Sequence, residues 1–340
     1  MLSRRALLLA ASLSPFWVLV SSFSYAQTTL DECILKTIQT AEESMTIGEV
    51  REICEKTQLT EADEAAAETA AGTAYERSAL EERFDAEREV ERRPFVITPH
   101  NPNYFMWTSS DDPNQAPYEE VTGITEPLED TEMKFQISIK APVWRHMFGS
   151  NIDTYFAYTA QSWWQLSNDD ISAPFRETNY EPEIFLRSFT EYNLFGWKLA
   201  GWTLGFNHQS NGRSEPLSRS WNRVVGRFGL EASNNLSFLV RAWHRIEEDE
   251  EDDDNPNTSH YYGYGDIRAI WTPNRNTFTA MLRPGTEETS YELTWSYPIG
   301  EVFRVYTQYY DGFGESLVDY DYENRRFGIG IALNDYLMRN

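Results

Sequence analysis

Hydrophobic and polar residues alternate through most of the chain after residue 95, which is the pattern of β-strands with one apolar and one polar face. In 134–141 the odd positions hold Phe, Ile, Ile and Ala, whereas the even positions hold Lys, Gln, Ser and Lys. The segments 291–297 and 327–334 repeat the pattern, with small or polar residues between the apolar ones. Counting such runs predicts twelve strands, near 96–109, 132–143, 152–166, 175–189, 196–210, 219–231, 236–246, 259–271, 276–283, 288–298, 302–311 and 323–336.

The polar face of these strands indicates whether the apolar face meets a protein core or lipid. It carries too many Lys, Gln, Arg and Glu side chains to form the core of a water-soluble sandwich. An even number of antiparallel strands can instead close into a barrel without free edges, with a polar interior and an apolar wall facing lipid. The pattern therefore predicts an all-β fold, a twelve-stranded antiparallel transmembrane β-barrel, over residues 94–340.

The residues before the barrel predict a cleaved leader and a helical extension. Residues 1–26 combine two arginines, a short apolar run and small residues at the end, which is the pattern of a secretory signal peptide; a retained membrane anchor is the alternative. Residues 27–93 are expected to lie in the periplasm. Helical spacing in 31–57 predicts a hairpin closed by a disulfide between Cys33 and Cys54, because two cysteines in an oxidising compartment usually pair. The charged stretch 61–92 predicts an exposed helix or a linker.

Composition and charge narrow the class of protein. The net charge of −25 argues against a nucleic-acid partner, because phosphate binding needs Lys and Arg. The 11 Trp, 19 Tyr and 19 Phe suit the aromatic girdles of a membrane barrel, although a secreted β-sandwich has a similar composition. Most of the acidic residues, including the run from Glu247 to Asp254, are expected to be solvated.

One group of polar residues interrupts the apolar outer rows of two neighbouring strands. His208 and Ser210 continue an apolar row that runs from Trp202 to Phe206, and Asn222 belongs to the apolar row of the next strand. Polar groups that face lipid cost free energy unless they pair with one another or lie near the interface. They are either ordinary polar residues near the loops at the membrane edge or a catalytic triad. In the triad, Ser210 is the nucleophile, His208 the base and Asn222 the residue that orients the imidazole.

Longer motifs around these residues resemble the outer membrane phospholipase A family. The run His-Gln-Ser-Asn-Gly-Arg-Ser at 208–214 and the run Ser-Arg-Ser-Trp-Asn-Arg at 218–223 carry the resemblance. Further stretches that agree with it are 161–168, 174–182 and 312–317. The resemblance covers about residues 95–337 and does not include 27–93.

The resemblance implies a fold, an activity and a cellular location. The fold is a twelve-stranded barrel in the outer membrane of a Gram-negative bacterium. The activity is calcium-dependent hydrolysis of phospholipid acyl esters at the sn-1 and sn-2 positions, and of lysophospholipids, by an enzyme that becomes active on dimerisation. His208, Ser210 and Asn222 match the triad of the family.

The resemblance also implies a calcium ion at each active site. Its ligands match the backbone carbonyls of Arg213 and Ser218, together with the Ser172 side chain of the partner subunit, and hard oxygen donors of this kind suit calcium. The ion stabilises the oxyanion together with a backbone N–H such as that of Gly212.

Two further assignments rest on the resemblance alone. A second calcium site of the family uses two Asp residues, and the matching positions here are Glu215 and Asp254, so this chain departs from the pattern at one of them. Gln161 matches a polar residue of the dimer interface.

Two other classes of function remain open at this point. A passive barrel, either a small pore or a structural protein, could use the interior Lys, Arg and Glu residues to line a channel, but it does not need polar residues on the outer wall. A soluble secreted esterase would partition into water without detergent.

Overall fold

The computed structural model describes residues 77–93, 96–122, 127–249, 251 and 253–339, together with a few positions between 37 and 54. The chain divides into two compact units, 1–75 and 76–340, and everything that follows concerns the second. The predicted signal peptide, most of the extension and Cys33 lie outside the described residues, so the Cys33–Cys54 disulfide and the leader stay predictions. No described helix is long and apolar enough to cross a membrane.

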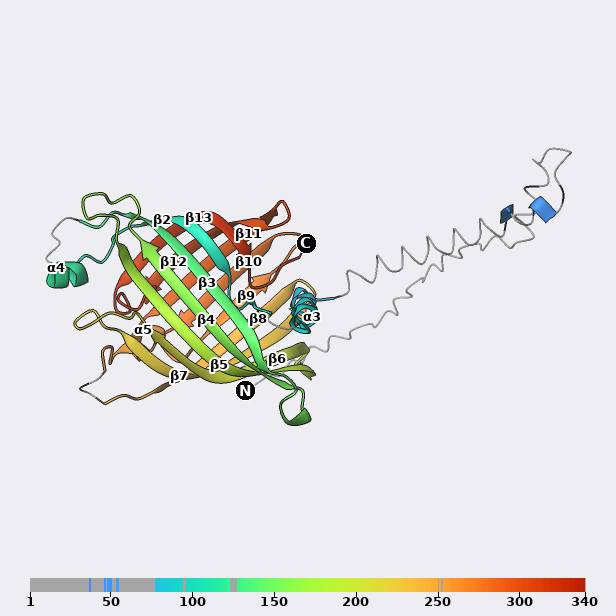
Figure 1. Cartoon of the computed structure of the whole chain (residues 1–340), viewed down its shortest axis with the longest axis horizontal. Helices are drawn as coiled ribbons and strands as arrows, with labels where there is room; N and C mark the ends of the chain where they lie inside the picture. The colour runs from blue at the N-terminus through green and yellow to red at the C-terminus, as the bar shows by residue number, and fades with distance from the viewer. Residues whose placement is uncertain are drawn as a thin grey trace, which may run out of the picture. The chain divides into compact units, whose positions relative to one another are not determined.

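Twelve antiparallel strands, β2 to β13, close into a barrel, as the alternation predicts (Figure 1). The ring closes because β3 pairs with β2 on one side and with β4 on the other. A two-residue strand, β1, adds a short pairing to β3. The strands are β1 (Thr98–Pro99), β2 (Asn103–Ser110), β3 (Thr131–Trp144), β4 (Ile152–Trp164), β5 (Phe175–Leu194), β6 (Trp197–Ser210), β7 (Ser220–Ser233), β8 (Leu236–Ile246), β9 (Gly265–Trp271), β10 (Thr277–Pro284), β11 (Thr289–Ile299), β12 (Phe303–Phe313) and β13 (Glu323–Asn334).

Two of the predicted strands differ from the structure. The run 96–109 is split into β1 and β2 at Pro102, which has no N–H for a ladder hydrogen bond. The run 259–271 begins with a short helix, α5 (Thr258–Tyr262), and only its second half is a strand. Gly263, at φ 61°, ends this helix where a Cβ atom would lie 1.9 Å from the carbonyl oxygen of Pro284, so the chain needs a glycine there. The remaining helices are α3 (Ala79–Glu91), α4 (Ala116–Thr122) and the 3₁₀ turn η1 (Met147–Gly149).

The alternation places polar side chains inside the barrel and apolar ones on its wall. Ile137 is 55% exposed on the wall, whereas the adjacent Ser138 is fully buried inside. Many charged interior groups are paired, as where the Glu315 carboxylate accepts from Lys134 Nζ at 2.8 Å and from Arg326 Nε at 2.9 Å. The interior therefore combines hydrogen-bonded ion pairs with apolar clusters, such as the one that contains Trp221, Trp243 and Tyr262.

The two ends of the barrel differ in the length of their connections. At one end, β5 joins β6 through 195–196 and β7 joins β8 through 234–235. At the other end the connections include 111–130, 165–174, 211–219, 247–264 and 314–322. Outer-membrane barrels have short periplasmic turns and longer extracellular loops, so the end with the long loops faces outward. Helix α3 and the C-terminus lie at the short-turn end (Figure 1).

Helix α3 packs into the barrel, which corrects the prediction of an exposed helix or linker in this part of 61–92. Ser78 and Glu81 form a capping box at its start. Farther along, the buried Glu87 accepts from Lys140 Nζ at 2.8 Å and from Arg187 Nη1 at 2.9 Å. Glu91 accepts from Arg187 Nη2 at 2.8 Å. The helix looks solvated in sequence because its inward positions carry acids. These acids pair with the basic side chains of Lys140 and Arg187 inside the barrel.

Replacing Glu87 with Gln should destabilise the barrel by about 3 kcal/mol, because it leaves buried basic groups without their partner. Burial by itself raises the pKa of Glu87, but the charges of Lys140, Arg83 and Arg187 outweigh it and hold the pKa well below its usual range. A depressed pKa stabilises the fold above the ordinary glutamate pKa of about 4.3, and this stabilisation is lost as the pH falls toward the depressed value.

Denaturation in detergent at neutral and acidic pH measures this difference. The exposed Glu89, on the same helix, provides the control variant Glu89→Gln. Equal stability of the two variants at neutral pH would show that the buried ion pairs do not hold α3 in place.

Candidate active site

The residues of the predicted triad lie on the outer wall at the long-loop ends of β6 and β7. His208 on β6 is directly opposite Asn222 on β7 in the antiparallel register, and Ser210 is opposite Ser220. The neighbours of His208 on its own row, Leu204 and Phe206, are 49% and 43% exposed. Asn207, on the alternate row, is buried inside the barrel. The outward direction predicted from strand phase is therefore confirmed.

His208 and Asn222 form a hydrogen bond across the two strands. His208 Nδ1 lies 3.0 Å from Asn222 Oδ1. An amide oxygen can only accept, so Nδ1 carries the proton and Nε2 has its lone pair available as a base. Ser210 follows two residues later on the same face, as a nucleophile activated by this base requires.

A carboxylate that the sequence analysis did not single out completes the contacts of Asn222. The Asn222 Nδ2 group donates to Glu248 Oε1 at 2.8 Å. In sequence, Glu248 is one of many acids in a run expected to be solvated. The strand register contains part of the missing signal, since Asn222 is opposite Ile246 and Glu248 comes two residues after this end of β8.

The loop after Ser210 is held compact by the side chain of Asn211. Asn211 Nδ2 donates to the carbonyl of Leu217 at 2.7 Å, and Asn211 Oδ1 accepts from the N–H groups of Arg213 and Arg219. Gly212 lies at the exposed start of this loop with φ 65°, a conformation that favours glycine. Gly212 thus follows Ser210 by two residues, on a turn held by Asn211.

Oxygen-rich groups gather at the end of the same loop. Ser218 Oγ donates to Asp254 Oδ2 at 2.6 Å. A hydrogen bond with Asp254, and its negative charge, raise the pKa of Glu215, so the two carboxylates lie close together. The Arg219 guanidinium donates to the carbonyl of Ser218 at 2.6 Å, which shows that a positive charge is accommodated at this oxygen.

These groups fit a calcium ion. Carboxylates, carbonyls and hydroxyls are the hard oxygen donors that calcium prefers. Across the described part of the chain no three or more His, Cys, Asp or Glu side chains converge as a metal cluster, so a site here depends on backbone and hydroxyl oxygens as well. Arg213, within this loop, is held in place because its guanidinium donates to the Arg176 carbonyl on β5 at 2.5 Å.

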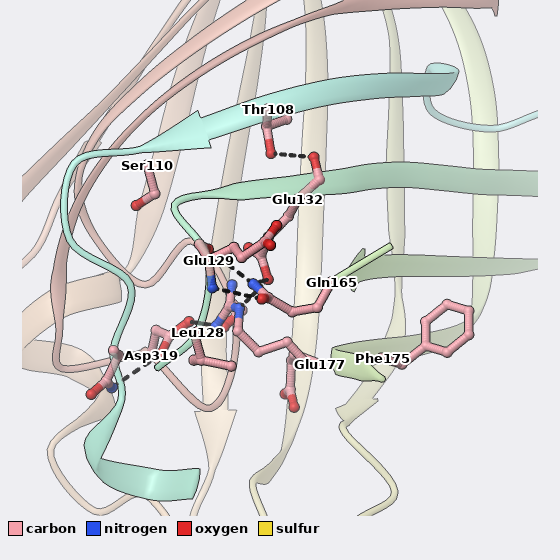
Figure 2. Close-up of polar contacts among 12 residues, drawn as sticks. Thr108, Ser110, Leu128, Glu129, Glu132, Gln165, Phe175, Glu177 and Asp319 are labelled. Atoms are coloured by element: carbon pink, nitrogen blue, oxygen red, sulfur yellow. Dashed lines mark hydrogen bonds and ion pairs between the residues drawn. The ribbon is translucent and has the colours of Figure 1, made fainter. Parts of the chain in front are cut away.

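Ser172 lies exposed in the loop between β4 and β5, away from the hydrogen bonds of the triad. Ser172 and Ala173 both have positive φ angles, 63° and 47°, in a tight turn. The start of this loop is fixed by Gln165, which donates to Glu132 and accepts from the Glu129 N–H, while Phe175 points away from these contacts (Figure 2). The loop therefore presents Ser172 outward from an anchored base.

The prediction for Gln161 is corrected by the structure. Its Nε2 donates to the hydroxyl of Tyr104 at 2.6 Å, and both side chains border the interior cavity. Gln161 is directly opposite Gln136 on β3, and its row points inward together with the buried Thr159. A residue inside the barrel cannot contact a second barrel through the membrane, so Gln161 is not an interface residue. The motif alone did not establish the strand phase at this position.

Comparison with known proteins shows which family this site belongs to. Residues 80–333 match the family model described as phospholipase A1. The chain belongs to the phospholipase A1 family. The phospholipase A1 of Escherichia coli (strain K12) is 41% identical over 244 residues, which is 71% of this chain and 83% of that protein. A putative phospholipase A1 of Neisseria meningitidis serogroup B is 34% identical over 317 residues, covering 89% of this chain and 81% of that protein.

Solved structures of this family agree with the fold. Outer membrane phospholipase A from Escherichia coli has a TM-score of 0.68 and 39% identity, covering 72% of this chain and all of that one. A calcium-bound dimer of the Salmonella typhi outer membrane phospholipase also has a TM-score of 0.68 and 39% identity, covering 72% of this chain and 94% of that one. The chain is thus a β-barrel protein of the Gram-negative outer membrane and a phospholipid-hydrolysing ester hydrolase, not a passive pore or a soluble esterase.

Proposed function

We propose that this chain is a calcium-dependent phospholipase that hydrolyses sn-1 and sn-2 acyl esters of phospholipids, and lysophospholipids, through Ser210, His208 and Asn222, and that it is active as a dimer. The hydrogen bond between His208 and Asn222 on the outer wall supports this proposal most strongly, because a barrel wall has no structural need for it. The fold places these residues in two adjacent strands with Ser210 on the same face.

The triad hydrolyses an ester in two steps. Ser210 Oγ attacks the acyl carbonyl carbon while His208 Nε2 takes the hydroxyl proton, and the imidazolium then gives that proton to the departing glycerol oxygen. A water molecule attacks the acyl-Ser210 ester, again losing a proton to His208 Nε2, and the fatty acid leaves as Ser210 regains its proton. Asn222 Oδ1 accepts from Nδ1–H throughout and keeps the ring in one orientation.

The position on the wall explains access to lipid. Leu204 and Phe206 lie below His208 on the same exposed row, so an acyl chain can remain in the apolar layer beside them while its ester reaches Ser210. Because the site is at the long-loop end, lipids of the outer leaflet are the ones that reach it.

Calcium would be held by the backbone carbonyls of Arg213 and Ser218 and by the Ser172 side chain of a second copy of this chain. When bound, the ion supplies positive charge that stabilises the oxyanion of the tetrahedral intermediate. The Gly212 N–H stabilises the same oxyanion by donating a hydrogen bond. A second calcium site at Glu215 and Asp254 is supported by the closeness of these two carboxylates, and the longer Glu215 side chain keeps the charge that the site needs.

The location of Ser172 supports the dimer. Its loop is anchored at Gln165 and directed outward, and it makes none of the hydrogen bonds of its own triad. A ligand placed in this way can serve the active site of a partner subunit, and a two-fold dimer gives both sites the same set of residues.

Hydrolysis of a phospholipid with different acyl chains at its two positions tests the proposed specificity. We expect the purified protein with calcium to release both fatty acids, and to release the remaining chain from each lysophospholipid. Release of the sn-1 chain alone would mean that the protein has only phospholipase A1 activity, and would contradict the proposed sn-2 activity. The Ser210→Ala variant provides the background for spontaneous hydrolysis.

A further inference from the structure

We propose that Glu248 is a positioning residue that fixes the orientation of the Asn222 amide and, through it, the tautomer of His208. This inference rests on the proposed triad. Asn222 uses both ends of its amide, because Oδ1 accepts from His208 Nδ1 at 3.0 Å and Nδ2 donates to Glu248 Oε1 at 2.8 Å. Glu248 therefore forms the third member of a hydrogen-bonded chain that begins at His208.

The chemistry of the amide explains why Asn222 needs a partner besides His208. The oxygen and nitrogen ends of an asparagine side chain are nearly the same in size, so shape alone does not decide which end meets the imidazole. If Nδ2 faced His208, the ring would have to accept at Nδ1 and carry its proton on Nε2, the atom that must act as the base. An ionised carboxylate only accepts hydrogen bonds, so Glu248 binds the Nδ2 end and directs Oδ1 toward His208.

The charge of Glu248 has a second consequence. Asn222 is neutral and by itself offers the imidazolium formed during the reaction only a dipole. Glu248 places a negative charge directly behind that dipole and polarises the amide, because hydrogen bonds in a chain strengthen one another. The Glu248 side chain is only 18% exposed, and Arg245 Nη2 lies 4.0 Å from its carboxylate.

The fold brings Glu248 to this point through strand register. Asn222 on β7 is directly opposite Ile246, the last residue of β8, and His208 is opposite Asn222 on the other side. Glu248 comes two residues after Ile246, at the start of the connection to β9, and its carboxylate reaches the Asn222 amide there. The adjacent Glu247 is more exposed.

The first test uses Glu248→Ala, with Glu247→Ala as the matched control. We expect Glu248→Ala to lower kcat for phospholipid hydrolysis about 10- to 100-fold at unchanged KM, as losses of residues that orient a reactive side chain commonly do. The control should keep wild-type activity. The rate at which a sulfonyl fluoride labels Ser210 should fall by the same factor as kcat, since both depend on His208 as the base.

A double-mutant cycle separates positioning from general destabilisation. In an Asn222→Ala background Glu248→Ala should cause no further loss, because its effect passes through the missing amide. Equal fold-losses in both backgrounds, or a wild-type kcat in Glu248→Ala, would overturn the role of Glu248. Full activity of Ser210→Ala would instead overturn the proposed triad itself, so the two failures are distinguishable.

A compensating pair gives a gain of activity as the readout. Asn222→Asp alone should be impaired, since it sets a second carboxylate against Glu248. Adding Glu248→Gln supplies an amide donor for the new carboxylate at position 222 and leaves the negative charge next to His208. The phospholipid hydrolysis of the double variant should therefore be at least tenfold higher than that of Asn222→Asp. No recovery in a folded double variant would contradict the proposed hydrogen-bonded chain.

Discussion

Ser210→Ala should reduce phospholipid hydrolysis by roughly 10⁴- to 10⁶-fold, the loss expected when the nucleophile of a triad is removed. The reason is that alanine has no hydroxyl to form the acyl-enzyme, and Ser220, directly opposite on β7, does not share a strand row with His208. Fatty-acid release from phospholipid in detergent micelles with calcium measures the loss. A sulfonyl fluoride should label the wild-type protein at Ser210 and leave the variant unlabelled.

A matched control is Ser233→Ala, an exposed serine at the short-turn end of β7. It should keep wild-type hydrolysis and labelling. Unchanged hydrolysis in Ser210→Ala would remove the serine mechanism altogether, whereas equal loss in the control would indicate damage to the barrel rather than to the site.

Mixing two inactive variants should restore activity if the active site is shared between subunits. Ser210→Ala lacks the nucleophile but has Ser172, and Ser172→Ala has the nucleophile but cannot supply the calcium ligand to its partner. In a mixed dimer, the Ser172→Ala subunit receives the intact Ser172 of the other subunit. A 1:1 mixture should therefore recover roughly a quarter of wild-type activity, since half of the dimers are mixed and each has one complete site.

The control mixture combines Ser210→Ala with His208→Ala. Both residues belong to the same strand, β6, so every site in that mixture lacks one of them and no activity should return. A strong calcium chelator should abolish the restored activity as well as that of the wild type. Full activity of Ser172→Ala by itself, or activity of a strictly monomeric and calcium-free sample, would contradict the shared site.

Strand phase carried most of what could be inferred about the site before the structure was known. The period of two put His208, Ser210 and Asn222 on one face, and the exposed Leu204 and Phe206 confirm that this face is outward. Gln161 belongs to the opposite phase of its strand and faces inward, so its resemblance to an interface residue does not carry over.

The charged segments show where sequence patterns fail. Glu87 and Glu248 each lie in a stretch rich in acids, and a stretch of this kind is normally solvated. Glu87 is instead buried and forms ion pairs with Lys140 on β3 and Arg187 on β5. Glu248 accepts a hydrogen bond from Asn222 on β7. Their partners are far away in the sequence, so no local pattern could identify them.

The sequence by itself determined the barrel, its twelve strands, the outward direction of His208, Ser210 and Asn222, and the family, because these depend on alternation and on contiguous motifs. Only the tertiary structure decided that Glu87 is buried, that Glu248 bonds to Asn222, that α3 packs into the barrel, and that Gln161 lies inside it. The physical reason is that alternation specifies on which side of the wall a residue lies, whereas a hydrogen-bond partner depends on the register between strands and on the closure of the ring.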